Sequence, residues 1–173
     1  MLGAQMQDVL IGLSTVKVPG RSETVDINKT FAVLIDYAHN PSSLEAILMN
    51  TKKYVKGRVI LVFGCGGNRD QSKRELMGEV ASLYSDYLII TNDNPRNEDE
   101  MDIINDIIKG VTTKYKVIPN RKDAIDYGLS LLNNFNVLVI LGRGNEDYIK
   151  IKDNLIPFND VNYIKEMIND YRK

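Results

Sequence analysis

The feature that most constrains the fold of this 173-residue chain is a regular alternation of short apolar runs with segments of helical periodicity. Short, continuously apolar runs are typical of strands that are covered on both faces. Strands and helices in strict succession require right-handed crossovers, which give a mainly parallel sheet. The five strand-like runs are residues 31–36, 58–63, 87–91, 115–118 and 137–141.

The segments between and after these runs place apolar residues on one side of a 3.6-residue repeat, so we predict five helices. Asn40 precedes a proline at the first helical position, and Asn120 can cap the fourth helix. Asn97 precedes three acidic residues, which the helix dipole favours in a first turn. The predicted apolar stripes are Leu44, Ile47, Leu48 and Val55; Leu76, Val80 and Leu83; Ile104, Ile107, Ile108 and Val111; Ile125, Leu129 and Leu132; and Val161, Ile164, Ile168 and Tyr171.

Composition and charge exclude several classes of protein. The 22 Lys and Arg residues against 23 Asp and Glu residues give a net charge of -1, whereas a general nucleic-acid-binding protein would show a basic excess. The single cysteine excludes a disulfide framework and a multi-cysteine zinc site. No apolar stretch approaches the ~20 residues of a membrane span. We therefore expect a cytoplasmic globular domain without a metal site of its own, which contacts neither nucleic acid nor membrane.

The turns that follow the predicted strands carry the functional inference. Ligands of open α/β sheets bind outside the carboxyl ends of the strands. Four of the five predicted strands end in polar, charged or glycine-rich turns. These turns are residues 36–41, 64–70, 93–96 and 142–148.

The first turn leaves two interpretations open. Asp36, His39 and Asn40 lie between a strand end and a helix start, where they can hold a polyol or a phosphate-linked group. Alternatively, Asp36 and Asn40 satisfy backbone amides and His39 is solvated, since a single histidine is a weak indication of a site.

The second turn contains three glycines, whose backbone can approach a ligand closely or bind an anion through a nest of N–H groups. Arg69, Lys73 and Arg74 add positive charge nearby and favour an anion site over a purely structural turn. The pattern is neither a Walker A loop nor a Gly-x-Gly-x-x-Gly fingerprint. We expect Cys65 to be a small buried residue rather than a nucleophile, because one histidine supports no catalytic triad.

The third and fourth turns also allow two interpretations each. Pro95 fixes the turn that carries Arg96, so this guanidinium can clamp a carboxylate at a helix start, or it can pair with the acids at 98–100 on the surface. In the fourth turn, Gly142 permits close approach, and Glu146 can accept a ligand ammonium or remain solvated.

If the four turns converge, Asp93 and Glu146 share one rim with Arg69 and Arg96. Such a rim would suit a ligand that carries both an ammonium and a carboxylate group. An amino acid with a zwitterionic far end is a ligand of this kind.

Read in order, the turns resemble the C-terminal domain of the Mur ligase family, closest to its MurE-type members, which add the third residue of the peptidoglycan stem peptide. The resemblance covers roughly residues 9–160. It implies a Rossmann-like three-layer αβα sandwich with a mostly parallel sheet of about six strands. The matching stretches are residues 18–23, 36–41, 62–70, 73–74, 76–78, 93–96 and 142–148.

The resemblance implies an ATP-dependent amide-bond ligase: ATP phosphorylates the D-glutamate carboxylate of UDP-MurNAc-L-Ala-D-Glu, and an amine attacks the acyl phosphate. Mg²⁺ neutralises the phosphates. Asp-Asn-Pro-Arg is the family's version of the third turn that selects meso-diaminopimelate. The resemblance assigns Arg69, Asp93, Asn94, Pro95, Arg96, Gly142 and Glu146 to this diamino acid, places Arg21, Asp36, His39 and Asn40 near ATP, and assigns no catalytic residue.

The sequence also departs from the family pattern. Arg143 and Asn145 stand where the family usually has lysine and histidine. A sulfur-containing analogue such as meso-lanthionine presents the same two charged ends as meso-diaminopimelate. No Gly-Lys-Ser/Thr phosphate loop is present. The resemblance therefore implies that residues 1–20 end a segment from a central ATPase domain and that 21–173 form the C-terminal domain. ATP, Mg²⁺ and the UDP-linked dipeptide would bind mainly to other domains, leaving this domain inactive alone.

Two alternatives remain open from the sequence. The chain can be the same lobe of another ligase of this superfamily, such as a folylpolyglutamate synthetase. It can also be a free-standing, non-catalytic module that binds an amino acid or a nucleotide.

Overall fold

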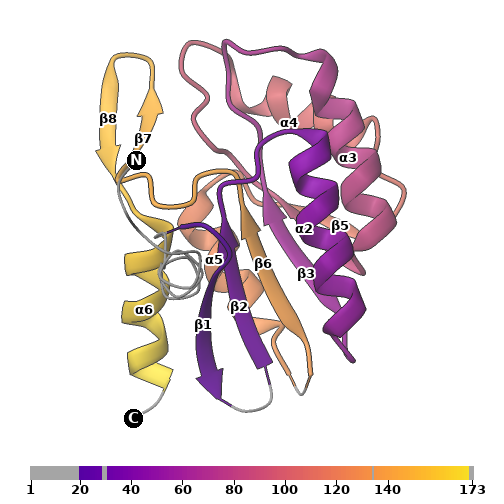
Figure 1. Cartoon of the computed structure of the whole chain (residues 1–173). Helices are drawn as coiled ribbons and strands as arrows, with labels where there is room; N and C mark the ends of the chain where they lie inside the picture. The colour runs from indigo at the N-terminus through magenta and orange to yellow at the C-terminus, as the bar shows by residue number, and fades with distance from the viewer. Residues whose placement is uncertain (1–19, 29–30, 134, 172–173) are drawn as a thin grey trace, which may run out of the picture.

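The computed structural model describes residues 20–28, 31–133 and 135–171, and its centre is a six-stranded sheet (Figure 1). The strands are β1 (Glu23–Asn28), β2 (Phe31–Asp36), β3 (Val59–Phe63), β4 (Tyr87–Ile90), β5 (Tyr115–Val117) and β6 (Val137–Leu141). Their order is β1-β2-β6-β3-β4-β5, in which β2 to β6 are parallel and β1 is antiparallel to β2. The predicted mostly parallel sheet is confirmed, and β1 is the strand that the apolar runs did not reveal.

Helices cover both faces of this sheet and make three layers. They are α2 (Pro41–Tyr54), α3 (Ser72–Tyr84), α4 (Glu100–Ile108), α5 (Arg121–Ser130) and α6 (Asp160–Tyr171). One core lies between the sheet and α2–α4, and the other lies between the sheet and α5 and α6 (Figure 1). Leu61 and Phe63 of β3 belong to the first core, and Ile60 and Val62 to the second. Because both faces are covered, β3 is apolar at every position.

Side-chain caps fix where three of the helices begin. Asn40 and Asn120 each accept a backbone N–H from the third residue of the following helix, at 2.9 and 3.2 Å, as predicted. The first turn of α4 was predicted at residues 98–100, but the helix begins only at Glu100 and is capped by Asp99.

Of the apolar stripe predicted for α3, Val80 packs against the first core, whereas the prediction was wrong for the two leucines. Leu76 is 49% exposed and Leu83 is 72% exposed, so the buried face of α3 is a different one. That face carries the small residues Gly78 and Ala81, because α3 and α4 approach closely: a Cβ on Gly78 would lie 2.2 Å from the carbonyl oxygen of Ile107. The close approach of the two helix backbones therefore decides which face of α3 is buried, and the two leucines stay exposed.

A two-stranded hairpin, β7 (Tyr148–Ile151) and β8 (Asn154–Pro157), follows β6 and was not predicted. It projects beside the end of the sheet at which β6 terminates (Figure 1). Arg96, in the third turn, forms a parallel bridge with Ile151 of β7. The hairpin is thus attached directly to one of the turns that carry candidate site residues.

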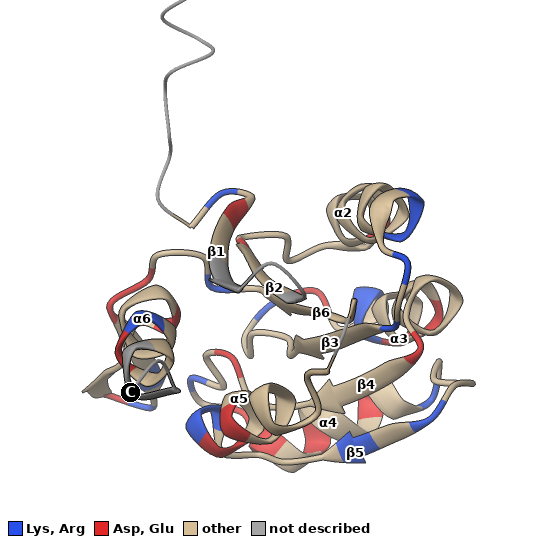
Figure 2. Cartoon of the chain, turned by 90° about the horizontal axis from the view of Figure 1, so that it is seen from below, with Lys and Arg blue, Asp and Glu red and all other residues tan. Residues whose placement is uncertain are grey.

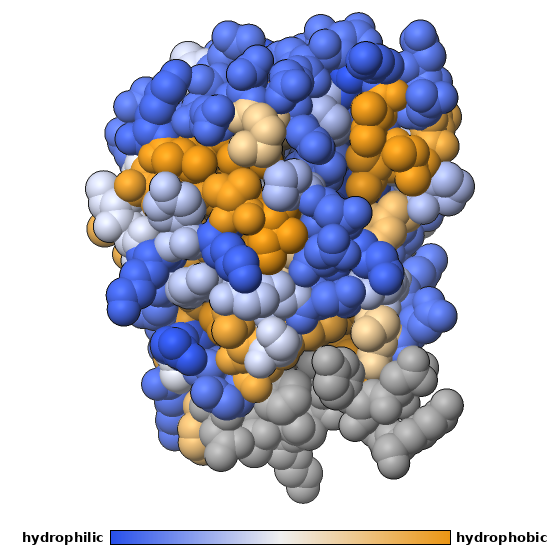
Figure 3. Space-filling view, turned by 180° about the vertical axis from the view of Figure 1, so that it is seen from behind, coloured by the Kyte–Doolittle hydropathy of each residue, from blue (hydrophilic) through white to orange (hydrophobic). Residues whose placement is uncertain are grey.

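The surface of the described residues mixes polar and apolar groups. Lys and Arg residues are interspersed with Asp and Glu residues (Figure 2), and on the face seen in Figure 3 the apolar side chains lie in separate patches among hydrophilic ones. None of the helices in the described part of the chain combines the length and the apolar character that crossing a bilayer requires.

Candidate ligand-binding cleft

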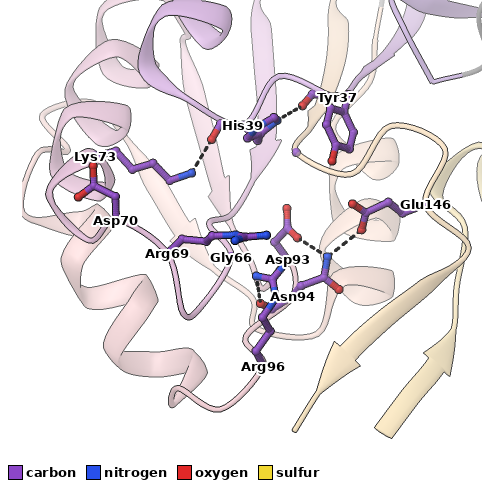
Figure 4. Close-up of a pocket in the computed structure, with 11 residues that line it drawn as sticks. Tyr37, His39, Gly66, Arg69, Asp70, Lys73, Asp93, Asn94, Arg96 and Glu146 are labelled. Atoms are coloured by element: carbon purple, nitrogen blue, oxygen red, sulfur yellow. Dashed lines mark hydrogen bonds between the residues drawn. The ribbon is translucent and has the colours of Figure 1, made fainter. Parts of the chain in front are cut away.

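A cleft of about 330 Å³ lies at the carboxyl ends of β2, β3, β4 and β6, where the four turns meet (Figure 4). It contains most of the residues predicted for the diamino acid, and also His39. The remaining predicted residues, Arg21, Asp36, Asn40 and Pro95, do not line it. The lining consists of Tyr37, His39, Gly66, Arg69, Asp70, Lys73, Asp93, Asn94, Arg96, Gly142 and Glu146.

One side of the cleft, the acidic wall, consists of Asp93, Asn94 and Glu146. Asn94 Nδ2 donates to Asp93 Oδ1 at 2.9 Å and to Glu146 Oε2 at 2.7 Å (Figure 4). Asp93 is only 6% exposed, and this burial raises the pKa of its carboxyl, although Arg121 and Arg143 oppose the shift. One side-chain amide therefore holds together two carboxylates that come from different turns.

Two fully buried arginines, Arg121 and Arg143, lie beneath the acidic wall. Arg121 donates through Nη2 and Nε to the Asp160 carboxylate, at 2.7 and 2.9 Å, and Arg143 Nε lies 3.8 Å from the same carboxylate. Arg143 Nη1 donates to Asn94 Oδ1 at 3.2 Å. Buried charges persist only when they are paired and hydrogen-bonded. No local sequence pattern indicates this cluster, because Asp160 lies 39 residues beyond Arg121.

The facing side of the cleft, the basic wall, consists of Arg69, Lys73 and Arg96. Lys73 Nζ donates to the carbonyl oxygen of His39 at 2.8 Å, and Arg96 Nη1 donates to that of Gly67 at 2.7 Å. None of the three cations forms an ion pair with any residue that the structure describes. Their charge is therefore available to an anionic group in the cleft.

The backbone of Arg96 is unusual, since its φ is 53°, in the left-handed region that non-glycine residues seldom adopt. Its N–H donates to the carbonyl oxygen of Lys150 at 3.0 Å, and its carbonyl oxygen accepts from the N–H of Lys152 at 2.6 Å. The β7–β8 hairpin thus fixes this residue. The predicted position at a helix start was wrong, because α4 begins only at Glu100.

Arg74 was predicted to add to the positive charge of the second turn, and this was wrong. It is 1% exposed, and its guanidinium pairs with Glu98 at 2.7 Å and with Asp106 at 3.0 Å. Glu98 also accepts the N–H of Asn68. Because Glu98 is occupied in this way, the alternative in which Arg96 pairs with it on the surface is also wrong.

The glycines of the second turn allow it to contact the third turn. The N–H of Gly67 donates to the carbonyl oxygen of Asn94 at 2.9 Å, and a Cβ on Gly67 would lie 1.9 Å from the carbonyl oxygen of Pro95. A Cβ on Gly66 would instead meet Arg96 Nη1 at 2.8 Å. Gly67 therefore serves the contact between turns, and Gly66 leaves room for the Arg96 guanidinium.

Cys65 lies in the same turn but belongs to the core. It is 3% exposed, its Sγ lies 3.6 Å from Met77 Sδ, and burial raises the pKa of the thiol to about 12. The expectation of a small buried residue is confirmed, since such a thiol stays protonated at neutral pH.

In the first turn, the two side-chain oxygens of Asp36 accept the N–H groups of Ser22 and Ala38, at 2.7 and 2.8 Å. Asn40 caps α2. These contacts are those of the structural interpretation. His39 is exposed, as that interpretation expects, and it also lines the cleft. The assignment of these residues to ATP stays a prediction.

Tyr37 is a cleft residue that the sequence analysis did not single out. The Arg21 guanidinium carbon lies 4.2 Å from the centre of the Tyr37 ring, and the Tyr37 and His39 rings meet edge to face with centroids 4.8 Å apart. This stack holds Arg21 beside the cleft rather than within it. An aromatic residue directly after a strand end was the available signal.

Comparison with known proteins agrees with this architecture. Residues 20–144 match the family described as "Mur ligase, glutamate ligase domain", and the chain belongs to this family. The resemblance found in the turns is therefore confirmed.

Three similar proteins show how the chain relates to the family. A protein of Syntrophomonas wolfei named UDP-N-acetylmuramoyl-L-alanyl-D-glutamate--2,6-diaminopimelate ligase is 45% identical over 155 residues, which is 87% of this chain and 32% of that protein. A solved structure of a ligase with this name superposes with a TM-score of 0.84 at 30% identity, over 99% of this chain and 36% of that one. The Escherichia coli FolC structure with ADP shares the fold (TM-score 0.68, 19% identity, 99% and 36% covered). The chain thus spans about a third of the length of these proteins.

Proposed function

We propose that this chain is the amino-acid-binding lobe of a ligase that adds meso-diaminopimelate, or a diamino acid with the same charged ends, to UDP-MurNAc-L-Ala-D-Glu. The observation that carries the proposal is the pair of walls in the cleft: the guanidinium groups of Arg69 and Arg96, which have no ion-pair partner among the described residues, face the carboxylates of Asp93 and Glu146. The names of the similar ligases support the same substrate.

The two walls match the far end of such a ligand, which carries one ammonium and one carboxylate. Arg69 and Arg96 would bind the far carboxylate, with the planar guanidinium favouring two parallel hydrogen bonds. Asp93 and Glu146 would accept the far ammonium. Lysine has the ammonium but no carboxylate at this end, so it would leave the guanidinium groups desolvated and unpaired, which costs about 1–3 kcal/mol.

The role of the chain in the reaction would be to hold the amine nucleophile. In an ATP-dependent amide-bond ligase, the D-glutamate γ-carboxylate takes the γ-phosphoryl group, ADP leaves, and the nearer amine of the diamino acid displaces phosphate from the acyl phosphate. Holding the amine by its far end makes this attack effectively unimolecular. The reaction uses a UDP-linked substrate, and we place it in the cytoplasm.

ATP and Mg²⁺ would be bound mainly outside this chain. Mg²⁺, when bound, neutralises the phosphate charges. Among the residues that the structure describes, no group of three or more His, Cys, Asp or Glu side chains could hold a metal ion. Arg21 and His39, at the rim of the cleft, are the residues of the first turn best placed to approach a nucleotide from another domain.

The choice between meso-diaminopimelate and meso-lanthionine concerns the middle of the ligand. Asn145, which replaces the usual histidine of the family, is exposed and accepts from Asn159 Nδ2 at 3.2 Å rather than lining the cleft. The cleft therefore offers the same charged groups to the ends of both ligands, and we expect similar affinities.

Calorimetric titration of the chain with meso-diaminopimelate, meso-lanthionine and L-lysine tests the proposal. We expect the first two to bind with similar affinity and L-lysine to bind about 10- to 100-fold more weakly, because it lacks the charged hydrogen bonds of the far carboxylate. Equal affinity for lysine and meso-diaminopimelate would contradict the assignment, as would no binding of any of the three at millimolar concentration.

A further inference from the structure

The side-chain amide of Asn94 lies between two sets of polar groups. On one side, its Oδ1 accepts from Arg143 Nη1 at 3.2 Å and from the N–H of Lys150 at 2.7 Å. On the other side, its Nδ2 donates to Asp93 at 2.9 Å and to Glu146 at 2.7 Å. The amide oxygen therefore accepts two hydrogen bonds, and the amide nitrogen donates both of its N–H groups.

The chemistry of the neighbours fixes the orientation of this amide. A guanidinium and a backbone N–H can only donate, whereas ionised carboxylates can only accept. If the amide of Asn94 were rotated by 180°, its NH₂ group would face two donors and its oxygen would face two carboxylates. The oxygen must therefore point to Arg143 and Lys150, which leaves both N–H groups of Asn94 committed to Asp93 and Glu146.

Arg143 is itself held in place from several directions. It is fully buried, and its Nη2 donates to the carbonyl oxygens of Tyr148 at 2.7 Å and of Phe158 at 3.0 Å. Its Nε lies 3.8 Å from Asp160, which Arg121 binds through two nitrogens. A guanidinium that is fixed in this way can hold the Asn94 amide in one orientation.

We propose that Arg143 and Asn94 are positioning residues of the ammonium subsite: Arg143 sets the orientation of the Asn94 amide, and this amide places the Asp93 and Glu146 carboxylates for the ligand. This inference rests on the proposed function in naming the ligand, but the contacts that carry it do not. It also changes the role expected of Asn94, which acts on the ligand through its two neighbours.

The arrangement explains how two carboxylates can share one subsite. Burial raises the pKa of the Asp93 carboxyl and the nearby Glu146 adds to this, whereas Arg121 and Arg143 lower it. The Asn94 amide donates one hydrogen bond to each of the two carboxylates. Within the described part of the chain, Asp93 Oδ2 and Glu146 Oε1 accept no hydrogen bond, so one oxygen of each carboxylate remains for an ammonium group.

Asn94→Asp separates positioning from a purely structural role. The aspartate keeps both acceptor contacts, to Arg143 and Lys150, and loses both donor contacts. We expect affinity for meso-diaminopimelate to fall about 10- to 100-fold in the folded variant, since charge-assisted hydrogen bonds are lost at the subsite. The melting temperature should fall as well, because the new carboxylate oxygen faces Asp93 and Glu146 in a buried position. If Asn94 only attaches the hairpin, affinity will stay at the wild-type value, which would overturn the proposal. Asn97→Asp, which adds the same charge to an exposed residue outside the cleft, is the matched control.

Arg143→Lys tests the other half of the proposal. Arg143 reaches Asn94 through Nη1 and the two carbonyl oxygens through Nη2. Lysine has a single nitrogen and lacks this fork, so the variant keeps the buried charge but loosens the amide. We expect a several-fold loss of affinity in the wild-type background and a clearly smaller further loss in the Asn94→Asp background, because Arg143 acts mainly through the Asn94 amide. Its direct contact with Glu146 is longer, with Arg143 Nη1 3.6 Å from Glu146 Oε2. Additive losses would show that Arg143 acts independently of Asn94 and would overturn the proposal.

A measurement without ligand keeps this inference distinct from the proposed function. In the nuclear magnetic resonance spectrum of the free chain, the Asn94 side-chain NH₂ protons should exchange with solvent at least about tenfold more slowly than those of the exposed Asn97, and Arg143→Lys should remove this protection. Exchange as fast as that of Asn97 in the wild-type chain would overturn the positioning role. Protection without any binding of meso-diaminopimelate would leave that role intact and overturn only the proposed substrate.

Discussion

The two walls of the cleft are built in different ways. The acidic wall rests on side chains, because Asn94 links Asp93 to Glu146 and the buried Arg143 holds Asn94 from beneath. The basic wall rests on the backbone: Arg96 is fixed by main-chain hydrogen bonds to the β7–β8 hairpin, and its side chain and those of Arg69 and Lys73 have no ion-pair partner among the described residues.

This difference follows from the electrostatics of the ligand. Two carboxylates that must stay ionised in a largely buried position need donors and buried cations nearby. Cations that must pair with a ligand carboxylate are more effective when no protein carboxylate competes for them. The protein therefore satisfies the acidic wall internally and leaves the basic wall to be completed by the ligand.

The largest expected effect comes from breaking the support beneath the acidic wall. Arg121→Met removes the hydrogen-bonded partner of the buried Asp160 carboxylate and leaves it the more distant Arg143, 3.8 Å away. We expect this to lower the free energy of unfolding by about 3–5 kcal/mol. Urea denaturation measures this. Lys122→Met, at an exposed neighbouring position of α5, is the control and should change stability by no more than about 0.5 kcal/mol. Equal effects of the two variants would contradict the importance of the buried pair.

Arg96→Ala breaks the basic wall and should affect ligand binding more than stability. We expect affinity for meso-diaminopimelate to fall by about 2 kcal/mol, or about 30-fold, with affinity for L-lysine nearly unchanged. In a ligase that carries this lobe, the KM for meso-diaminopimelate should rise and the KM for ATP should not. The control is Arg58→Ala, at the opposite end of β3. Equal losses for both amino acids, or for ATP, would show that the guanidinium is misassigned.

The acidic wall should make binding depend on pH. Burial raises the pKa of Asp93 above the ordinary value of about 3.9. Above this raised pKa the carboxylate is ionised and attracts an ammonium, so affinity for meso-diaminopimelate should be full there and fall as the pH decreases through it. Asp93→Asn should lower affinity about tenfold and remove this dependence.

Calorimetric titration with meso-diaminopimelate at several pH values measures this dependence of affinity on pH. Asp86→Asn, at the amino end of β4, should keep the wild-type profile. A wild-type profile in Asp93→Asn would place the titrating group elsewhere.

The smallest effect concerns the space beside the basic wall. Gly66→Ala places a methyl group 2.8 Å from Arg96 Nη1, with the next atoms at 3.7 Å or more, so the guanidinium must shift. We expect a loss of about 1 kcal/mol, or about fivefold, in affinity for meso-diaminopimelate at unchanged melting temperature. Gly67→Ala, which meets the backbone of Pro95 at 1.9 Å, should lower the melting temperature instead. The same loss for L-lysine as for meso-diaminopimelate would contradict this role of Gly66.

The sequence predicted the parts of the molecule that depend on local patterns. Five strands, the caps Asn40 and Asn120, and the convergence of four turns all follow from apolar periodicity and from the rule that strand ends meet at one edge. Glycines and charges in these turns were sufficient to indicate Arg69, Arg96 and Glu146.

Features that depend on long-range pairing could not be predicted. The Arg121–Asp160 pair joins helices 39 residues apart in sequence, and nothing local marks either residue as buried. The positive φ of Arg96 arises from its bridge to β7, a hairpin that the apolar runs did not reveal. The buried face of α3 was likewise decided by the close approach of α4 at Gly78.

A crystal structure of the chain with meso-diaminopimelate bound is the most direct test of the two-wall account. We predict that the far carboxylate of the ligand lies within hydrogen-bond distance of the Arg69 and Arg96 guanidinium groups, and that the far ammonium contacts Asp93 and Glu146. A ligand bound outside the cleft, or one whose far end turns away from both walls, would contradict the account.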